Sequence, residues 1–198
     1  MGSKNRSIDM ITPRMGFIVY GVHKDGLKDP LGNPFIDEQV IAQSKRALVD
    51  RGVELVEYPI VVATKNEARL AFKTMKDDER VDGVILFSGT WVWASNMIAA
   101  IRDYGLTGKG ICIWTHPGSQ GWRPVGGLVL HGALLEIGIP HQFVYGFAEE
   151  SDEIDKIFHF SQACHLKNRL NQATVGAFGG RGMGQTVGVA DPSVDESF

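Results

Sequence analysis

Five short hydrophobic runs alternate with five segments of helical periodicity along this chain, and this alternation limits its possible folds more than any other feature. The runs predict strands at residues 16–23, 53–62, 81–87, 110–114 and 141–147. The expected helices are 37–51, 65–76, 94–104, 125–137 and 152–171. Strands that alternate with helices are joined by right-handed crossovers and form a parallel sheet covered on both faces. The sequence therefore predicts a doubly wound α/β sandwich of three layers.

The first strand is expected in the centre of this sheet. Its run Phe17-Ile18-Val19-Tyr20 carries no charge, which is typical of a parallel strand buried on both faces. We expect the strand order 2-1-3-4-5, in which the topological switch lies between the first and third strands. The residues after His23 would then face those after Phe87 at the carboxyl edge, where such sheets bind ligands.

Several residues are typical of helix ends. Thr64 and Ser151 are candidate N-caps, because a hydroxyl just before a helix accepts a hydrogen bond from its first turn. Gly52, Gly105 and Gly138 follow helical segments and are expected to end them.

Composition and charge exclude several classes of partner. The 198 residues carry a formal net charge of -3, so the chain gains no long-range attraction to nucleic acid or to an anionic membrane surface. No apolar stretch reaches the roughly 18 residues of a membrane span. Cys112 and Cys164 fall in predicted buried elements and are interpreted as thiols in a reducing compartment. We therefore expect a cytoplasmic protein.

A sixth hydrophobic run, at residues 174–178, follows a sheet that is already complete. We expect residues 1–171 to form an N-terminal α/β domain, and 172–198 to be the incomplete start of a second α/β domain, beginning with its first strand. The glycine-rich segment that comes next lacks the third glycine of a dinucleotide loop, because Gln185 stands there. Arg181 in this segment is a candidate to bind a ligand oxygen or contact another domain.

All four tryptophans lie at or near predicted strand ends: Trp91, Trp93, Trp114 and Trp122. Ligands of open parallel sheets bind at the carboxyl ends of the strands, so aromatic residues gathered there indicate a site as well as a core.

Three longer motifs resemble the N-terminal half of the L-fucose isomerase family. They are residues 87–93 (FSGTWVW), residues 117–127 (PGSQGWRPVGG), and residues 179–184 (GGRGMG) followed by residues 190–192 (ADP). The resemblance implies a metal-dependent aldose-ketose isomerase with two α/β domains and a C-terminal β-rich domain, assembled as a trimer or hexamer. In this family Mn2+ polarises the sugar, and a carboxylate base moves a proton through an enediol. The family's metal ligands lie beyond this segment, so we expect no catalytic or metal-binding residue in the chain and no activity from it alone.

The resemblance also implies sugar contacts from the strand tips, reaching the site of a neighbouring subunit. Trp91 matches the substrate-facing tryptophan of the family, although a core or interface role is an equal alternative. Trp93 is a weaker candidate and is interpreted as mainly structural. The fucose enzymes carry an arginine at the first tip, where this chain instead offers His23 and Lys24 as hydrogen-bonding groups.

The fourth strand tip holds the remaining candidates, His116, Gln120, Trp122 and Arg123. Arg123 can anchor a hydroxyl or a neighbouring carboxylate, or can pack in a loop at an oligomer interface. Three histidines on predicted helices have no i, i+4 histidine partner, so they are interpreted as structural rather than as zinc ligands. These are His131, His159 and His165.

Two other functions remain open at this stage. The same flavodoxin-like sheet can serve as a non-catalytic sugar-binding or regulatory module, because fold alone does not fix function. A flavin-binding protein is the third interpretation, although the sequence offers no distinct phosphate loop for that cofactor.

Overall fold

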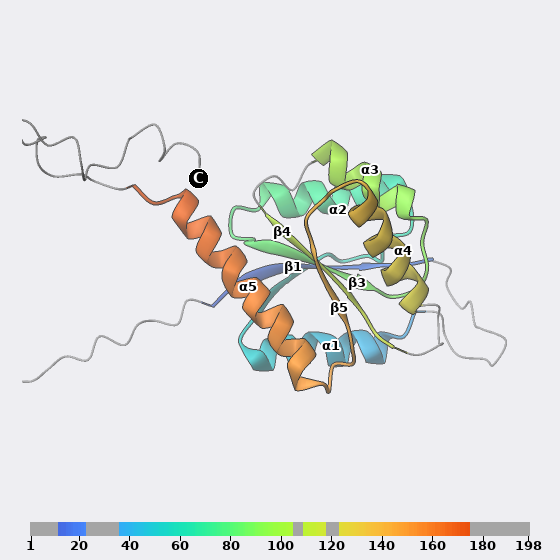
Figure 1. Cartoon of the computed structure of the whole chain (residues 1–198), viewed down its shortest axis with the longest axis horizontal. Helices are drawn as coiled ribbons and strands as arrows, with labels where there is room; N and C mark the ends of the chain where they lie inside the picture. Colours follow the sequence, from blue (N-terminus) through green and yellow to red (C-terminus); the bar gives the residue numbers. More distant parts are fainter. Residues whose placement is uncertain (1–11, 23–35, 105–108, 118–122, 175–198) are drawn as a thin grey trace, which may run out of the picture.

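A five-stranded parallel sheet in the order β2-β1-β3-β4-β5 forms the centre of the molecule (Figure 1). The computed structural model describes residues 12–22, 36–104, 109–117 and 123–174. The strands are β1 (Arg14–Tyr20), β2 (Glu54–Glu57), β3 (Gly83–Ser88), β4 (Gly110–Thr115) and β5 (Gln142–Tyr145). The helices are α1 (Glu38–Arg51), α2 (Lys65–Asp77), α3 (Ala94–Tyr104), α4 (Arg123–Glu136) and α5 (Ser151–Asn171). The predicted strand order is confirmed.

Helices cover both faces of the sheet, which makes three layers. Helices α1 and α5 pack on one face, and α2, α3 and α4 pack on the other (Figure 1). Alternate residues of β1 serve the two cores, because Phe17 lies with α1 and α5 whereas Ile18 lies with the other three helices. The doubly wound, flavodoxin-like sandwich is thus the fold of the described chain.

Helix ends follow the sequence signals at three of the four expected positions that the structure describes. Thr64 and Glu67 form a reciprocal capping box at the start of α2. Gly52 ends α1 with φ 101°, a left-handed conformation that glycine adopts without strain. The prediction for Ser151 is wrong, since it is the first helical residue of α5 and Glu150 occupies the cap position without a side-chain cap bond. Gly138 ends α4 as predicted: it has φ 71°, its N–H donates to Leu135 O at 3.1 Å, and the N–H of Ile139 donates to Leu134 O at 2.9 Å. Gly105 lies outside the described residues.

Most element boundaries differ from the predicted ones by one to three residues, and the end of β2 differs by five. Strand β2 ends at Glu57, and Val62 returns to the sheet only through a single bridge to Tyr20. Helix α4 begins at Arg123, two residues before the predicted start. Pro124 is compatible with this because the first turn of a helix needs no intrahelical N–H donor.

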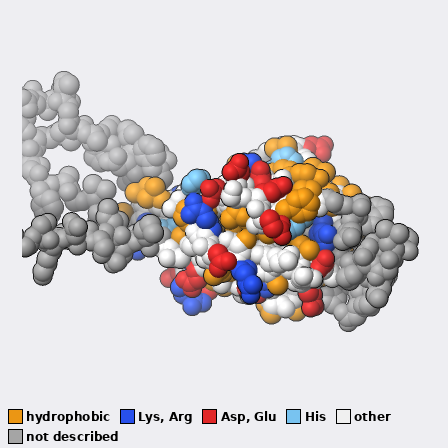
Figure 2. Space-filling view, turned by 90° about the horizontal axis from the view of Figure 1, so that it is seen from below, with side chains coloured by type: hydrophobic (Ala, Val, Ile, Leu, Met, Phe, Trp, Pro, Cys, Tyr) orange, Lys and Arg blue, Asp and Glu red, His pale blue; other side chains and the backbone are white. Residues whose placement is uncertain are grey.

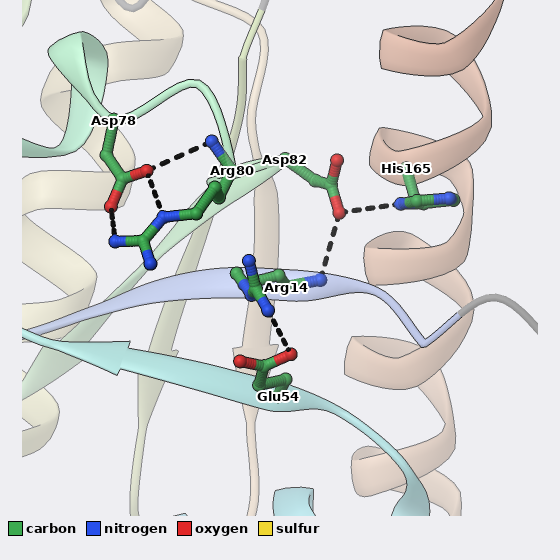
Figure 3. Close-up of polar contacts among 6 residues, drawn as sticks. All are labelled: Arg14, Glu54, Asp78, Arg80, Asp82 and His165. Carbon is green, nitrogen blue, oxygen red and sulfur yellow. Dashed lines mark hydrogen bonds and ion pairs between the residues drawn. The ribbon is translucent and has the colours of Figure 1, made fainter.

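A buried carboxylate joins α5 to the sheet at the amino edge. Asp82, only 5% exposed at the start of β3, accepts a hydrogen bond of 2.9 Å from the backbone N–H of Arg14. Its carboxylate also bonds His165 Nδ1 of α5 at 2.8 Å (Figure 3). Asn168 Nδ2 of the same helix donates to it at 3.1 Å. These contacts give His165 the structural role expected from the sequence. Cys112 and Cys164 are buried, as predicted, and burial raises the pKa of Cys164 to about 11.

The surface carries mixed charge. Seen from below (Figure 2), hydrophobic side chains gather at the upper right, while acidic and basic side chains are interspersed elsewhere on this face. Among the helices of the described chain, none is both long and apolar enough to cross a membrane.

Candidate functional site

The tips of β1 and β3 approach each other closely at the carboxyl edge of the sheet. The backbone N–H of Gly89 donates to Tyr20 O at 2.9 Å, and the N–H of Gly21 donates to Val62 O at 2.9 Å. A Cβ atom at Gly21 would lie 2.5 Å from the side chain of Thr90, so only glycine fits there. This is the switch point predicted from the strand order, and it leaves room for the next helix to begin over β3 and β4.

The first residue of α4 is anchored directly to this edge. The carbonyl oxygen of Arg123 accepts hydrogen bonds of 2.8 Å from Ser88 Oγ at the end of β3 and from Thr115 Oγ1 at the end of β4. Both hydroxyls are buried. The backbone from which the Arg123 side chain projects is therefore held by two strands.

The guanidinium of Arg123 is buried without hydrogen-bond compensation. Its side chain is only 7% exposed, and within the structure as described its Nε and Nη1 atoms have no hydrogen-bond partner. The nearest carboxylate oxygen is Asp37 Oδ2, 3.8 Å from Nη1, beyond hydrogen-bonding range. Burial lowers the pKa of Arg123, and the Asp37 carboxylate opposes that shift. Burying the donors of a cation without hydrogen-bond partners costs free energy. Charged groups in such unfavourable surroundings are common in binding sites.

Asp37 cannot swing towards Arg123 without breaking the cap of α1. Its Oδ1 atom accepts hydrogen bonds from the backbone N–H groups of Gln39 and Val40, at 3.1 and 3.2 Å. Its Oδ2 atom is left facing Arg123. A fixed acceptor and a fixed donor thus face each other at the beginning of two different helices.

His116 forms the buried wall beside this pair. It is 4% exposed, its Nε2 is hydrogen-bonded to Ser44 Oγ of α1 at 3.0 Å, and its ring packs edge-on against Phe87. Burial, followed by the neighbouring charge of Arg123, lowers the pKa of His116 to about 4. The imidazole is therefore neutral at pH 7, and Arg123 carries the only positive charge among these groups.

Two tryptophans extend the edge beyond β3. The rings of Trp91 and Trp93 meet edge-to-face, with centroids 4.5 Å apart and an interplanar angle of 66°. Trp93 is 65% exposed, whereas Trp91 is half-buried. Trp93 was the weaker candidate in the sequence, yet it is the more accessible aromatic surface. Trp114 is fully buried in β4, and its Nε1 donates to Gly146 O, so it belongs to the core.

The structure brings four of the predicted candidate residues to this edge: Trp91, Trp93, His116 and Arg123. Five others lie outside the described residues, namely His23, Lys24, Gln120, Trp122 and Arg181. Sequence reasoning missed Asp37 and Ser44. The available signal for Asp37 was its place just before a helical pattern, which is typical of an N-cap but does not reveal what its second oxygen faces.

The remaining histidines of interest make pairwise contacts. His131 Nδ1 and His141 Nε2 are hydrogen-bonded at 2.7 Å, and His141 Nδ1 donates to Ile139 O. His159 is exposed beside Phe158. In the part of the chain that the structure describes, no three His, Cys, Asp or Glu side chains lie together as a metal site.

A hollow of about 540 Å³ lies at the opposite, amino edge, away from the tryptophans and Arg123. Its walls include Ile111, Phe160 and Lys109. Lys109 Nζ already donates to two carbonyl oxygens at the end of α2, each at 2.7 Å. These bonds give Lys109 a structural role, and we place the candidate site at the carboxyl edge, where donors and aromatic surfaces are free.

Comparisons with known proteins add no family assignment. No protein-family model matches the chain, and no curated protein sequence matches it. Among solved structures, a flavodoxin of Streptococcus pneumoniae TIGR4 aligns with a TM-score of 0.34 and 10% identity. The alignment covers 77% of this chain and 99% of the flavodoxin. The fold assignment rests on the strand order and helix layers described above.

Proposed function

We propose that this chain is the sugar-contacting domain of a metal-dependent aldose-ketose isomerase of the L-fucose isomerase type. The observation that carries the proposal is the Trp91 and Trp93 pair at the carboxyl edge, in the motif that resembles the family's substrate-facing segment. An indole face packs against the C–H face of a sugar and excludes water without an ionised group. We further propose a cytoplasmic, homo-oligomeric protein.

The described residues would bind and orient the sugar rather than break its bonds. The half-buried ring of Trp91 meets that of Trp93 edge-to-face, so the two indoles together would supply an apolar surface for the sugar. His116 is neutral and already hydrogen-bonded to Ser44, so it would shape the pocket rather than add charge. A divalent ion such as Mn2+, when bound, would polarise the sugar carbonyl and hydroxyl. The described residues offer no set of three ligands for it.

Calorimetric titration of the chain with L-fucose, L-arabinose and D-arabinose tests the binding part of the proposal. We expect the substitution Trp91→Ala to weaken binding by about tenfold, as the loss of one aromatic contact does. Leu170→Ala, at an exposed site on α5, is the matched control and should leave affinity unchanged. Equal affinities of Trp91→Ala and the wild type would contradict the proposal.

The catalytic part is tested by ketose formation with and without Mn2+. We expect no turnover from this chain alone, and Mn2+-dependent turnover from a longer polypeptide that adds the family's carboxylate and histidine ligands. A longer polypeptide that binds sugar but never isomerises it would support the non-catalytic sugar-binding module instead.

A further inference from the structure

Arg123 and Asp37 present a free donor and a free acceptor to the same small space. Arg123 Nη1 and Asp37 Oδ2 lie 3.8 Å apart, and in the described structure neither Nη1 nor Nε of Arg123 has a hydrogen-bond partner. That separation is too long for a direct bond, and it is a span that one oxygen atom bonded to both groups would bridge. Nη1 and Nε have almost no accessible surface in the free protein, so a bridging ligand oxygen must displace the atoms that cover Nη1. The Asp37 side chain is 27% exposed, so this side of the pair opens to solvent.

We propose that Arg123 and Asp37 form a subsite for a hydroxyl group of a neutral sugar, a deepening that rests on the proposed function. A hydroxyl is the one common ligand group that can accept from the guanidinium and donate to the carboxylate at the same time. Arg123 Nε remains as a second donor for another ligand oxygen. Trp91 would then supply the apolar wall of the site, and this pair its polar anchor.

The surrounding charges favour a neutral ligand over an anionic one. Asp37 faces the guanidinium directly, and Glu149 is near enough to act electrostatically on the adjacent His116. His116 is neutral at pH 7, so Arg123 has no second cation beside it in this group. A phosphate or carboxylate placed between Arg123 and Asp37 would meet like charge from Asp37.

Both groups are held in place before any ligand arrives. Asp37 is fixed by its cap bonds to the first turn of α1, and the Arg123 backbone is fixed by Ser88 and Thr115. Preorganised partners lose little entropy on binding, which is how a site gains affinity from a few polar contacts. The cost is a buried guanidinium without full hydrogen bonding in the free protein.

Calorimetry on the 198-residue chain tests the subsite with D-arabinose, L-fucose and D-arabinose 5-phosphate as probes. Arg123→Met keeps the side-chain volume but removes the donors, and Asp37→Asn keeps the cap of α1 but removes the charge. Each substitution should lower the affinity for both neutral sugars by about tenfold. Asp152→Asn, at an exposed position on α5, is the control for loss of one carboxylate. The phosphate should bind more weakly than D-arabinose.

Two further readouts separate a binding role from a structural one. Because one hydroxyl bridges both residues, the double variant should lose no more affinity than the worse single variant, whereas additive losses would overturn the bridge. Arg123→Met should also raise the melting temperature, because it removes uncompensated buried charge. A lower melting temperature would show that Arg123 stabilises the free protein and would overturn the subsite.

The outcomes distinguish the two proposals. Loss of binding in Trp91→Ala, with Arg123→Met and Asp37→Asn unchanged, would overturn the subsite alone. Loss of binding in Arg123→Met and Asp37→Asn, with Trp91→Ala unchanged, would overturn the aromatic contact and support the subsite. Tighter binding of D-arabinose 5-phosphate, abolished in Arg123→Met, would replace the hydroxyl subsite by an anion site. Failure of the wild type to bind any of the three probes would overturn both proposals.

Discussion

Burial sets the chemistry of individual residues at the carboxyl edge. Arg123 and His116 are each more than nine-tenths buried and lie close enough for the arginine charge to depress the histidine pKa. A cation beside a neutral imidazole avoids repulsion between like charges, so protonation of His116 would disturb the packing around Arg123. The state of His116 is therefore linked to the stability of the fold.

We expect His116 to make the protein less stable as the pH falls. Its folded-state pKa of about 4 lies below the unfolded value, so the unfolded chain binds more protons between about pH 6.5 and 4. The stabilising contribution is complete above pH 6.5 and is lost towards pH 4, by on the order of 2–3 kcal/mol. Urea unfolding of the wild type and of His116→Gln at several pH values measures how the free energy of unfolding of each protein changes with pH.

The difference between wild type and His116→Gln isolates this histidine from the acidic residues, which titrate in both proteins. The free energy of unfolding of the wild type should fall more steeply between pH 6.5 and 4. Parallel curves for the two proteins would show that His116 does not titrate differently in the folded state.

At the scale of elements, α5 depends on a polar contact as well as on its apolar face. The carboxylate of Asp82 links the start of β3 to β1 through Arg14, and to α5 through His165 (Figure 3). Asn168 of α5 donates a further hydrogen bond to it. These contacts span 83 and 86 residues of sequence on the α5 side. Asp82 thus fixes the position of the C-terminal helix on the sheet.

Removal of that carboxylate should loosen α5. We expect Asp82→Ala to lower the free energy of unfolding by about 2–4 kcal/mol, because three buried or partly buried donors lose their acceptor. Asp103→Ala removes an exposed partner of Arg69 and should cost less than about 1 kcal/mol. Chemical denaturation monitored by far-ultraviolet circular dichroism measures both, and similar losses for the two variants would contradict the role of Asp82.

At the scale of the whole molecule, α4 bears on the proposed homo-oligomer. Its solvent side is apolar and uncharged at Val125, Leu128, Val129 and Leu135, with exposures from 39% to 62%. A helix that is apolar on its buried and exposed sides is typical of an element covered in an assembly. Glu136 is the exposed carboxylate of α4, so a symmetric interface through this helix would keep that charge at its solvated rim.

We expect association of the chain through α4. Multi-angle light scattering should give a mass that is a multiple of 21.7 kDa, and the double substitution Leu128→Lys and Leu135→Lys should return it towards 21.7 kDa. Leu70→Lys, at a site 58% exposed on α2, is the control and should leave the mass unchanged. A wild type of 21.7 kDa at high concentration would contradict the prediction.

The alternation of hydrophobic and helical segments was sufficient to predict the layers and the strand order, and it indicates the edge where we place the candidate site. These follow from the sequence because strand and helix periodicities are local, and because crossover handedness leaves few arrangements of five such units. The sequence also predicted tryptophans at the tip of the third strand, because Trp91 and Trp93 follow that strand directly along the chain.

Only the tertiary structure decided which polar groups face one another. Asp37 and Arg123 are 86 positions apart in the sequence, and Ser44 and His116 are 72 apart, so no local pattern pairs them. Their burial and the unpartnered nitrogens of Arg123 depend on where α1 and α4 begin at the carboxyl edge of the sheet. Hydrophobic periodicity determines which face of an element is buried, but the pairing of buried polar atoms is set by packing in three dimensions.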